Sequence, residues 1–242
     1  MFQRILVPLD GSKQAEQAIP VAIRLARASH GSILLLRVVD SLNEFGLYSV
    51  GSMLFLQQTI DKDLIDAAAY LAEIAHTIGC EGIEAHIAVF SGQVVPQILD
   101  VANAQDIEMI VLCSHGSTGF KRWTLGSVAH KVVHQSPLPV LLLHAQSEHV
   151  QVQTTYPLRA LVPLDGSPLA EAALLPMAQV VAAMSPSGTG ELHLMQVVKI
   201  PFIDEEYGDG QDTALRYRQA AFQTAREYLQ MTQAKLSREL TE

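Results

Sequence analysis

The sequence has few cysteines, no long apolar run and a shortage of positive charge. Its only cysteines, Cys80 and Cys113, lack the CxxC or paired spacing of a metal site, so free buried thiols are expected. No apolar stretch approaches the roughly 20 residues that span a bilayer. The opening MFQRILVPLDGS meets an acidic residue and a turn too early for a signal peptide. We therefore expect a cytoplasmic protein with no membrane partner.

Positive charge is outnumbered: 16 Lys and Arg face 25 Asp and Glu, which gives a formal charge of -9 and a pI near 5.4. There is no basic run with interleaved aromatic residues, and aromatics make up only 6% of the chain. This composition argues against nucleic acid as a partner. Apolar residues make up 49% of the 242, enough for a sizeable core in one large or two small domains.

The chain contains an internal repeat. The segment RILVPLDGS at 4–12 recurs as RALVPLDGS at 159–167, and Ala15-Glu16 recurs as Ala170-Glu171 at the same offset. Further on, LRVV at 36–39 aligns with MQVV at 195–198. Two copies of one domain type are predicted. Their expected bounds are 1–145 for the first copy, 146–158 for a polar linker and 159–242 for the second.

The first copy alternates strand and helix patterns. Short apolar runs predict strands at 5–9, 32–39, 83–90, 107–112 and 139–143. Between them, apolar stripes predict one helix spanning Ala15 to Ala26, a long one ending at Gly79, and two more near 94–102 and 128–135. Strict alternation predicts an α/β fold: a right-handed, doubly wound, Rossmann-like sheet of five parallel strands.

The second copy stops early. It has patterns for a strand from Arg159, a helix to about 183, a strand at 192–198, a loop to about 212 and a helix at 213–240. The counterparts of the next strand, helix, phosphate loop and closing strand do not follow. Two strands and two helices bury little surface, so this half should lean on the first domain, on another chain or on further C-terminal sequence.

A glycine-bearing segment, CSHGSTGFKRWTLGS from Cys113 to Ser127, follows an apolar run and precedes an amphipathic one. This order indicates a strand, a loop and a helix start, where unpaired N–H groups can bind a phosphate. Gly116 and Gly119 could equally supply plain turns. The loop lacks the GK[ST] ending of a Walker A motif, so fast hydrolysis is not expected.

Three motifs together resemble the universal stress protein family in its tandem form: VPLDGS, RVVD, and SHG followed after nine residues by GS. The resemblance covers essentially the whole chain, with the second copy incomplete. It implies a Rossmann-like domain that binds ATP, with magnesium, in the first copy. The family's pattern places a glycine at the start of this loop, where the present chain has Cys113. Gly116, Gly126 and Ser127 match the rest of the pattern.

The resemblance also implies roles for single residues. Asp10 would lie beside the adenosine, and the Val38 backbone would bond to adenine. The remaining contacts to nucleotide are implied for Pro8, Leu9, Cys113, Ser114, His115, Gly116, Gly126, Ser127 and Val128. Asp10-Gly11-Ser12 is also a common helix opening, so a plain turn and N-cap is the alternative role of Asp10. Cys113 is either a reactive thiol beside the ligand or a small buried apolar residue.

These expectations favour an ATP-binding regulatory protein of stress response or signalling, with at most slow ATPase activity. The alternatives are an enzyme that hydrolyses ATP or transfers its phosphoryl group, and a nucleotide-free assembly protein. We expect no catalytic residue, no protein metal site at His130 and His134, and no nucleophile–base pair at Ser114-His115. The family resemblance implies a homodimer, or domain pairing, through the fifth strand at 139–143, and a signalling partner that the sequence does not identify.

Overall fold

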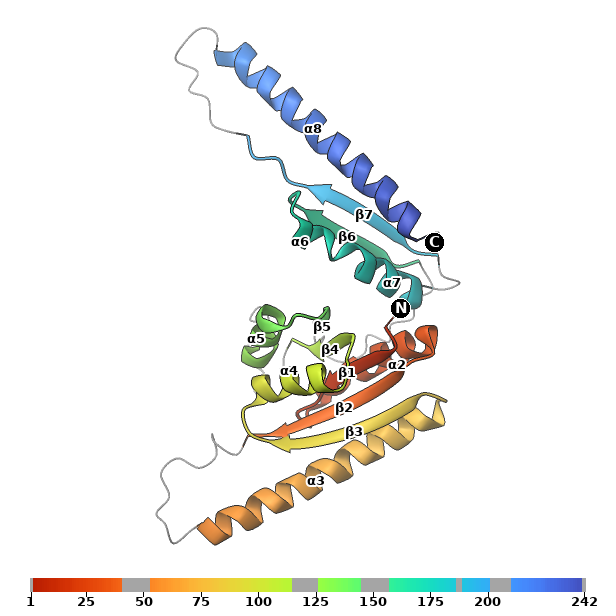
Figure 1. The fold of residues 1–242 in the computed structure, drawn as a ribbon, viewed down its shortest axis with the longest axis vertical. Coiled ribbons are helices and arrows are strands. Elements are labelled where there is room, and N and C mark those ends of the chain that lie inside the picture. The colour runs from red at the N-terminus through yellow and green to blue at the C-terminus, as the bar shows by residue number, and fades with distance from the viewer. Residues whose placement is uncertain are drawn as a thin grey trace. The chain divides into compact units, whose positions relative to one another are not determined.

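A computed structural model describes residues 2–40, 53–114, 126–144, 157–185, 189–200 and 210–240. The chain divides into two compact units, Met1–Gln153 and Thr154–Glu242. Each unit is described by itself, and both are drawn in Figure 1.

The first unit is a five-stranded parallel sheet in the order β3-β2-β1-β4-β5, which confirms the predicted fold class. Its strands are β1 (Arg4–Pro8), β2 (Ser32–Val39), β3 (Glu84–Ser91), β4 (Met109–Cys113) and β5 (Val140–Leu143). Its helices are α1 (Lys13–Glu16), α2 (Ala18–Ser29), α3 (Met53–Cys80), α4 (Val94–Ala104) and α5 (Ser127–Gln135). Strand bounds differ by one or two residues from the sequence prediction, as strand ends commonly do.

Helices cover both faces of this sheet. On one face α2 packs on β1 and β4, and α3 packs along β2 and β3, as Figure 1 shows. On the other face α4 and α5 contact each other and enclose a core with Leu6 and Leu36, which are both fully buried. Right-handed crossovers place the helices this way, because the strand order reverses direction at β1. The carboxyl ends of β1 and β4 therefore meet where the two halves of the sheet diverge.

The predicted single helix over Ala15 to Ala26 is wrong, since the chain forms α1 and α2 with a break at Gln17. Pro20 explains the break. Its ring has no N–H to donate and would clash with the carbonyl of Glu16 four residues earlier, so α2 starts anew with Pro20 in its first turn. The second unit breaks in the same way, at Ala172 and Ala173, with Pro176 in the first turn of α7.

Gly79 does not end the long helix, contrary to the sequence prediction. The helix continues to Cys80, and the left-handed residue that follows is Gly82, at φ +78°. The backbone N–H groups of Glu81 and Ile83 both donate to the Ile78 carbonyl, at 3.0 and 3.5 Å. The glycine that stops this helix is thus the one three positions later, where a positive φ is required.

The second unit pairs β6 (Arg159–Leu164) with β7 (Glu191–Gln196), in parallel. Its helices are α6 (Pro168–Glu171), α7 (Leu174–Met184) and α8 (Gly210–Glu239). Pro163 lies opposite Met195, as Pro8 lies opposite Leu36, so the sequence repeat keeps the same strand register in both units. A small core is formed by Val162, Leu164, Leu174 and Leu236.

Candidate functional site

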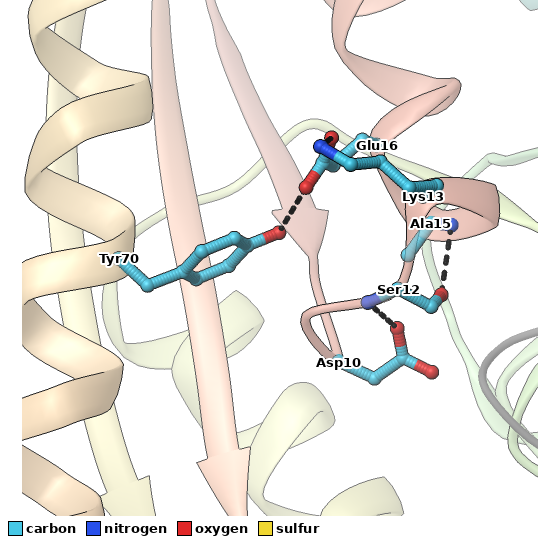
Figure 2. A network of polar contacts seen from close by, with 6 residues as sticks. All are labelled: Asp10, Ser12, Lys13, Ala15, Glu16 and Tyr70. Carbon is cyan, nitrogen blue, oxygen red and sulfur yellow. Dashed lines mark hydrogen bonds and ion pairs between the residues drawn. The ribbon is translucent and has the colours of Figure 1, made fainter.

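Asp10 lies just past the carboxyl end of β1, in a tight turn that opens α1. Its Oδ1 accepts the backbone N–H of Ser12 at 2.9 Å, and the Ser12 hydroxyl accepts the N–H of Ala15 at 3.1 Å. Figure 2 shows both bonds. Gly11, between them, has φ +84°, which a side chain would strain. The carboxylate therefore has the turn role that sequence allowed, and this bond uses only one of its two oxygens.

The backbone polar groups of Val38 face the space beyond the carboxyl end of β1. The Leu36 carbonyl accepts the N–H of Leu9 at 2.8 Å, and the Val39 carbonyl accepts the N–H of Gly92 at 2.9 Å. Alternate residues of a parallel strand bond to opposite neighbours, so Leu36 and Val38 are directed toward β1 and Val39 toward β3. Because β1 ends at Pro8, opposite Leu36, the polar groups of Val38 point past its end, beside Asp10.

Cys113 ends β4 and is buried, with 8% of its surface exposed. Its Sγ lies 3.9 Å from the carbonyl oxygen of Ala15, so the side chain is directed at α1. Burial raises the pKa of the Cys113 thiol to about 11, the charge of Asp10 acts in the same direction, and a backbone hydrogen bond from Ala18 opposes them. A neutral, enclosed thiol is the outcome, and not a reactive thiolate.

The two ends of the glycine-bearing loop are tied together. Gly126 donates its backbone N–H to the Ser114 carbonyl at 2.7 Å, and Ser114 donates its own to Leu143 of β5, also at 2.7 Å. Gly126 is the N-cap of α5 and, as a glycine, makes no side-chain cap bond of its own. The first N–H groups of α5, from Ser127 and Val128 onward, thus open at the carboxyl edge of the sheet. His115 and Gly116 lie outside the described residues, as do Lys121 and Arg122.

Ser114 has a polar neighbour that sequence reasoning did not identify. Its hydroxyl lies 3.4 Å from Nδ1 of His144, although the two residues are 30 positions apart. Only 3% of Ser114 is exposed. The pair links the end of β4 to the end of β5, and Ser114 is itself too buried to act as a nucleophile, although His144 is exposed.

A pocket of about 560 Å³ lies beside the Asp10 turn, between the carboxyl ends of β1 and β2 and the helix α3. It is lined by Asp10, Gly11, Arg37, Val38, Val39, Asp40, Asp63, Asp66, Ala67 and Tyr70. Four carboxylates against one guanidinium give these walls a negative balance. Among these residues, the sequence implied nucleotide contacts only for Asp10 and Val38, because no local pattern indicates that α3 lies beside the strand ends.

Tyr70 spans the distance from α3 to α1. Its hydroxyl donates to Oε1 of Glu16 at 3.1 Å, and the other oxygen of Glu16 accepts from Lys13 at 3.1 Å. Figure 2 shows the ring reaching across to Glu16. Burial and the Glu16 carboxylate raise the pKa of Tyr70 above its usual value. The guanidinium carbon of Arg37 lies 5.3 Å from the centre of the Tyr70 ring, within cation–π range.

The described residues include neither a cluster of metal ligands nor a membrane-spanning helix. Among the described residues, no group of three or more His, Cys, Asp or Glu side chains could hold a metal ion. The rings of His130 and His134 on α5 contact each other at a tilt of 47°, with ring centres 4.4 Å apart. No helix in the described part of the chain is long and apolar enough to cross a membrane.

Comparisons with known proteins agree on one family. The family profile described as universal stress protein family matches residues 1–144. The Methanocaldococcus jannaschii universal stress protein MJ0531 is 27% identical over 143 residues, which cover 59% of this chain and 82% of that protein.

Solved structures share the fold. The Lactobacillus plantarum universal stress protein UspA has a TM-score of 0.54 at 23% identity, covering 59% of this chain and 97% of its own. An Archaeoglobus fulgidus universal stress protein has a TM-score of 0.59 at 23% identity and covers 93% of this chain and 75% of its own. With a family profile matched over more than half of its length, this chain belongs to the universal stress protein family.

Proposed function

We propose that the first unit binds an adenine nucleotide, ATP with magnesium, and acts as a regulatory module of stress response or signalling. The nucleotide would lie at the carboxyl edge of the sheet, between the Asp10 turn and the start of α5. The other residues proposed to contact it are those around this edge: Pro8, Leu9, Val38, Cys113, Ser114, His115, Gly116, Gly126, Ser127 and Val128.

One observation carries this proposal. The Gly126–Ser114 bond of 2.7 Å closes the loop at its base and places the N-terminus of α5, whose N-cap glycine has no capping side chain, on the same edge as Asp10. Such an end carries partial positive charge and unpaired N–H groups, which suit a phosphate. The sheet edge at a reversal of strand order is also where ligands bind in this class of fold.

The charges around the site favour one orientation of the bound nucleotide. The pocket beside Asp10 carries the carboxylates of Asp40, Asp63 and Asp66, which repel phosphates. The phosphates are therefore proposed to lie at α5, and the ribose hydroxyls beside the Asp10 carboxylate. The polar groups of Val38, directed past the end of β1, suit the edge of an adenine.

Two other universal stress proteins of solved structure hold adenine nucleotides. One is in complex with cAMP, and one from Arabidopsis thaliana has AMP bound. Their TM-scores to this chain are 0.43 and 0.42, so shared family membership, and not similarity of shape, connects them to it.

Regulation is favoured over catalysis. The chain has no Walker A lysine to stabilise a leaving phosphate, and Ser114 is buried against His144. A thiol with a pKa near 11 is a poor nucleophile at neutral pH. Slow turnover would appear as phosphate release from the full chain that Asp10→Asn abolishes.

The direct test is acid extraction of the purified protein, followed by chromatography of the released nucleotide and titration with ATP. We expect Asp10→Asn to weaken ATP binding tenfold to about a hundredfold, the usual worth of a hydrogen bond to a charged group. The amide can keep the bond to Ser12, so the turn should survive. Asp165→Asn is the matched control, because Asp165 accepts from Ser167 with the same 2.9 Å geometry in the second unit.

Equal effects of the two substitutions, or a wild-type protein that binds no adenine nucleotide, would refute the proposal. If Asp10→Asn bound ATP with unchanged affinity, the role of Asp10 would be limited to forming the turn.

We also propose that β5 pairs with the β5 of a second copy. It is an edge strand of four half-buried residues, Val140–Leu143, with β4 on one side. Light scattering of the full chain tests this, and a monomer at working concentration would count against it.

A further inference from the structure

We propose that Arg37 is a positioning residue for the nucleotide: it restrains the turn that carries Asp10, from the face of the sheet opposite α4 and α5. This inference rests on the proposed function for its effect on binding, but the restraint itself can be measured without any ligand. In the sequence, Arg37 is the first residue of the RVVD motif and interrupts an otherwise apolar strand, but neither feature indicates what its side chain contacts.

Arg37 lies directly against the Asp10 turn. A Cβ added to Gly11 would collide with Nη1 of Arg37 and would lie 3.2 Å from its Cζ. The guanidinium is therefore in contact with the backbone of Gly11. The lack of a side chain at this position leaves room for the contact, in addition to allowing the φ of +84°.

The guanidinium is itself held in place. Its carbon lies 5.3 Å from the centre of the Tyr70 ring, and the Tyr70 hydroxyl is bonded to Glu16 at 3.1 Å. Glu16 belongs to α1, the helix that the Asp10 turn opens. Arg37, Tyr70 and Glu16 thus connect β2, α3 and α1 around the turn, and Figure 2 shows the Tyr70–Glu16 part of this connection.

The second unit shows the same turn without the arginine. Asp165 accepts from Ser167 at 2.9 Å, Gly166 has φ +88°, and Tyr228 donates to Glu171 at 3.1 Å. The position of Arg37 is taken by Gln196, which lies opposite Leu164 in β6. Its Nε2 stands 3.9 Å from a Cβ built on Gly166, so the contact with the turn is looser.

This comparison separates two roles. Since the turn has the same shape with glutamine, arginine is not needed to form it. What differs is the tightness of the contact and the positive charge beside the turn. A restrained carboxylate loses less freedom when it binds a hydroxyl, so restraint of the turn raises affinity.

The test uses amide hydrogen exchange at Ser12, whose N–H is bonded to Asp10, together with calorimetric titration of AMP into the full chain. Arg37→Gln copies the second unit, so it should fold. We expect it to speed exchange at Ser12 at least about threefold and to weaken AMP binding about tenfold. Arg37→Lys keeps the charge and most of the stem, so it should recover part of both losses.

Gln196→Arg is the matched control. It should slow exchange at Ser167 and leave AMP binding unchanged, because the second unit lacks the other half of the proposed site in its described part. A purely structural role for Arg37 predicts a lower melting temperature with unchanged local exchange at Ser12.

Wild-type exchange at Ser12 in Arg37→Gln would overturn the inference, whether or not AMP binds. Faster exchange with unchanged AMP affinity would overturn its link to binding. A wild-type chain that binds neither AMP nor ATP would contradict the proposed function instead, while the exchange comparison would still decide the restraint.

Discussion

The two units begin with the same strand, turn, helix and strand, yet among the described residues only the first unit has helices on both faces of its sheet. On the face under α2 and α3 the units agree: Val7 and Val162 are both buried, as are Ile78 of α3 and Leu236 of α8. The hydrogen bonds of the Asp10 turn and the Asp165 turn have equal lengths, 2.9 Å at the carboxylate and 3.1 Å at the cap.

The two units differ in burial on the opposite face of the sheet, which α4 and α5 cover in the first unit. Leu6 and Leu36 are fully buried under α4 and α5, whereas their counterparts Leu161 and Met195 are 59% and 37% exposed. Val197, the counterpart of Val38, is 76% exposed. The comparison teaches that the second unit keeps the turn and one helix layer of this fold although its described residues include no counterpart of α4 and α5.

The largest expected effect tests this difference in burial. Leu6→Ala should lower the free energy of unfolding of the first unit by ~2–5 kcal/mol, because it leaves a cavity in a closed core. Leu161→Ala should cost the second unit less than ~1 kcal/mol, since the side chain is mostly exposed. Residue-resolved hydrogen exchange in urea would measure each unit separately. A cost at Leu161 equal to that at Leu6 would mean that this face is covered in solution.

The second effect is the reactivity of Cys113, which ends β4. This strand lies beside β1 and has no counterpart in the described part of the second unit. At pH 8 a thiol of pKa about 11 carries about a hundredfold less thiolate than one of pKa 9.0. Alkylation of Cys113 should therefore be slower by about that factor, and mass spectrometry of Cys80→Ser would measure it. Alkylation as fast as that of an ordinary thiol would show that β4 opens readily.

The same thiol makes the first unit sensitive to alkali. Because folding raises the pKa of Cys113 above 9.0, the folded state favours the neutral thiol. Its contribution to stability is complete below pH 9 and is lost as the pH rises from 9 toward 11. Cys113→Ala should flatten this part of the stability profile, and an unchanged profile would contradict the assignment.

The smallest expected difference lies at the caps. Ser12→Ala and Ser167→Ala should each destabilise their unit by ~1 kcal/mol, the usual cost of losing an N-cap. The cap geometries are nearly identical, with φ -84° in both and ψ 149° and 148°. Thermal unfolding of the two variants would measure the costs. Clearly unequal costs would show that the shared turn is supported differently in the two units.

Much of the fold could be predicted because its signals are local. The apolar runs, the alternation with helices and the nearly letter-for-letter recurrence of VPLDGS are sufficient for the five-stranded sheet and the repeat. The errors were local as well: the effect of Pro20 on a helix start was missed, and Gly79 was taken for the stop that Gly82 provides. Asp10, Gly126 and Ser127 could be named as candidates because each follows a strand or opens a helix.

Contacts between distant segments could not be predicted in this way. The sequence by itself determined the doubly wound α/β class, the turn at Asp10 and the helix start that follows the glycine-bearing loop, since these depend on residue period and on neighbours along the chain. Only the tertiary structure showed Arg37 against Gly11, Tyr70 bonded to Glu16, and the thiol of Cys113 turned to α1. Those contacts join residues 26 to 98 positions apart, and the packing of helices on the sheet, which no local pattern encodes, brings them together.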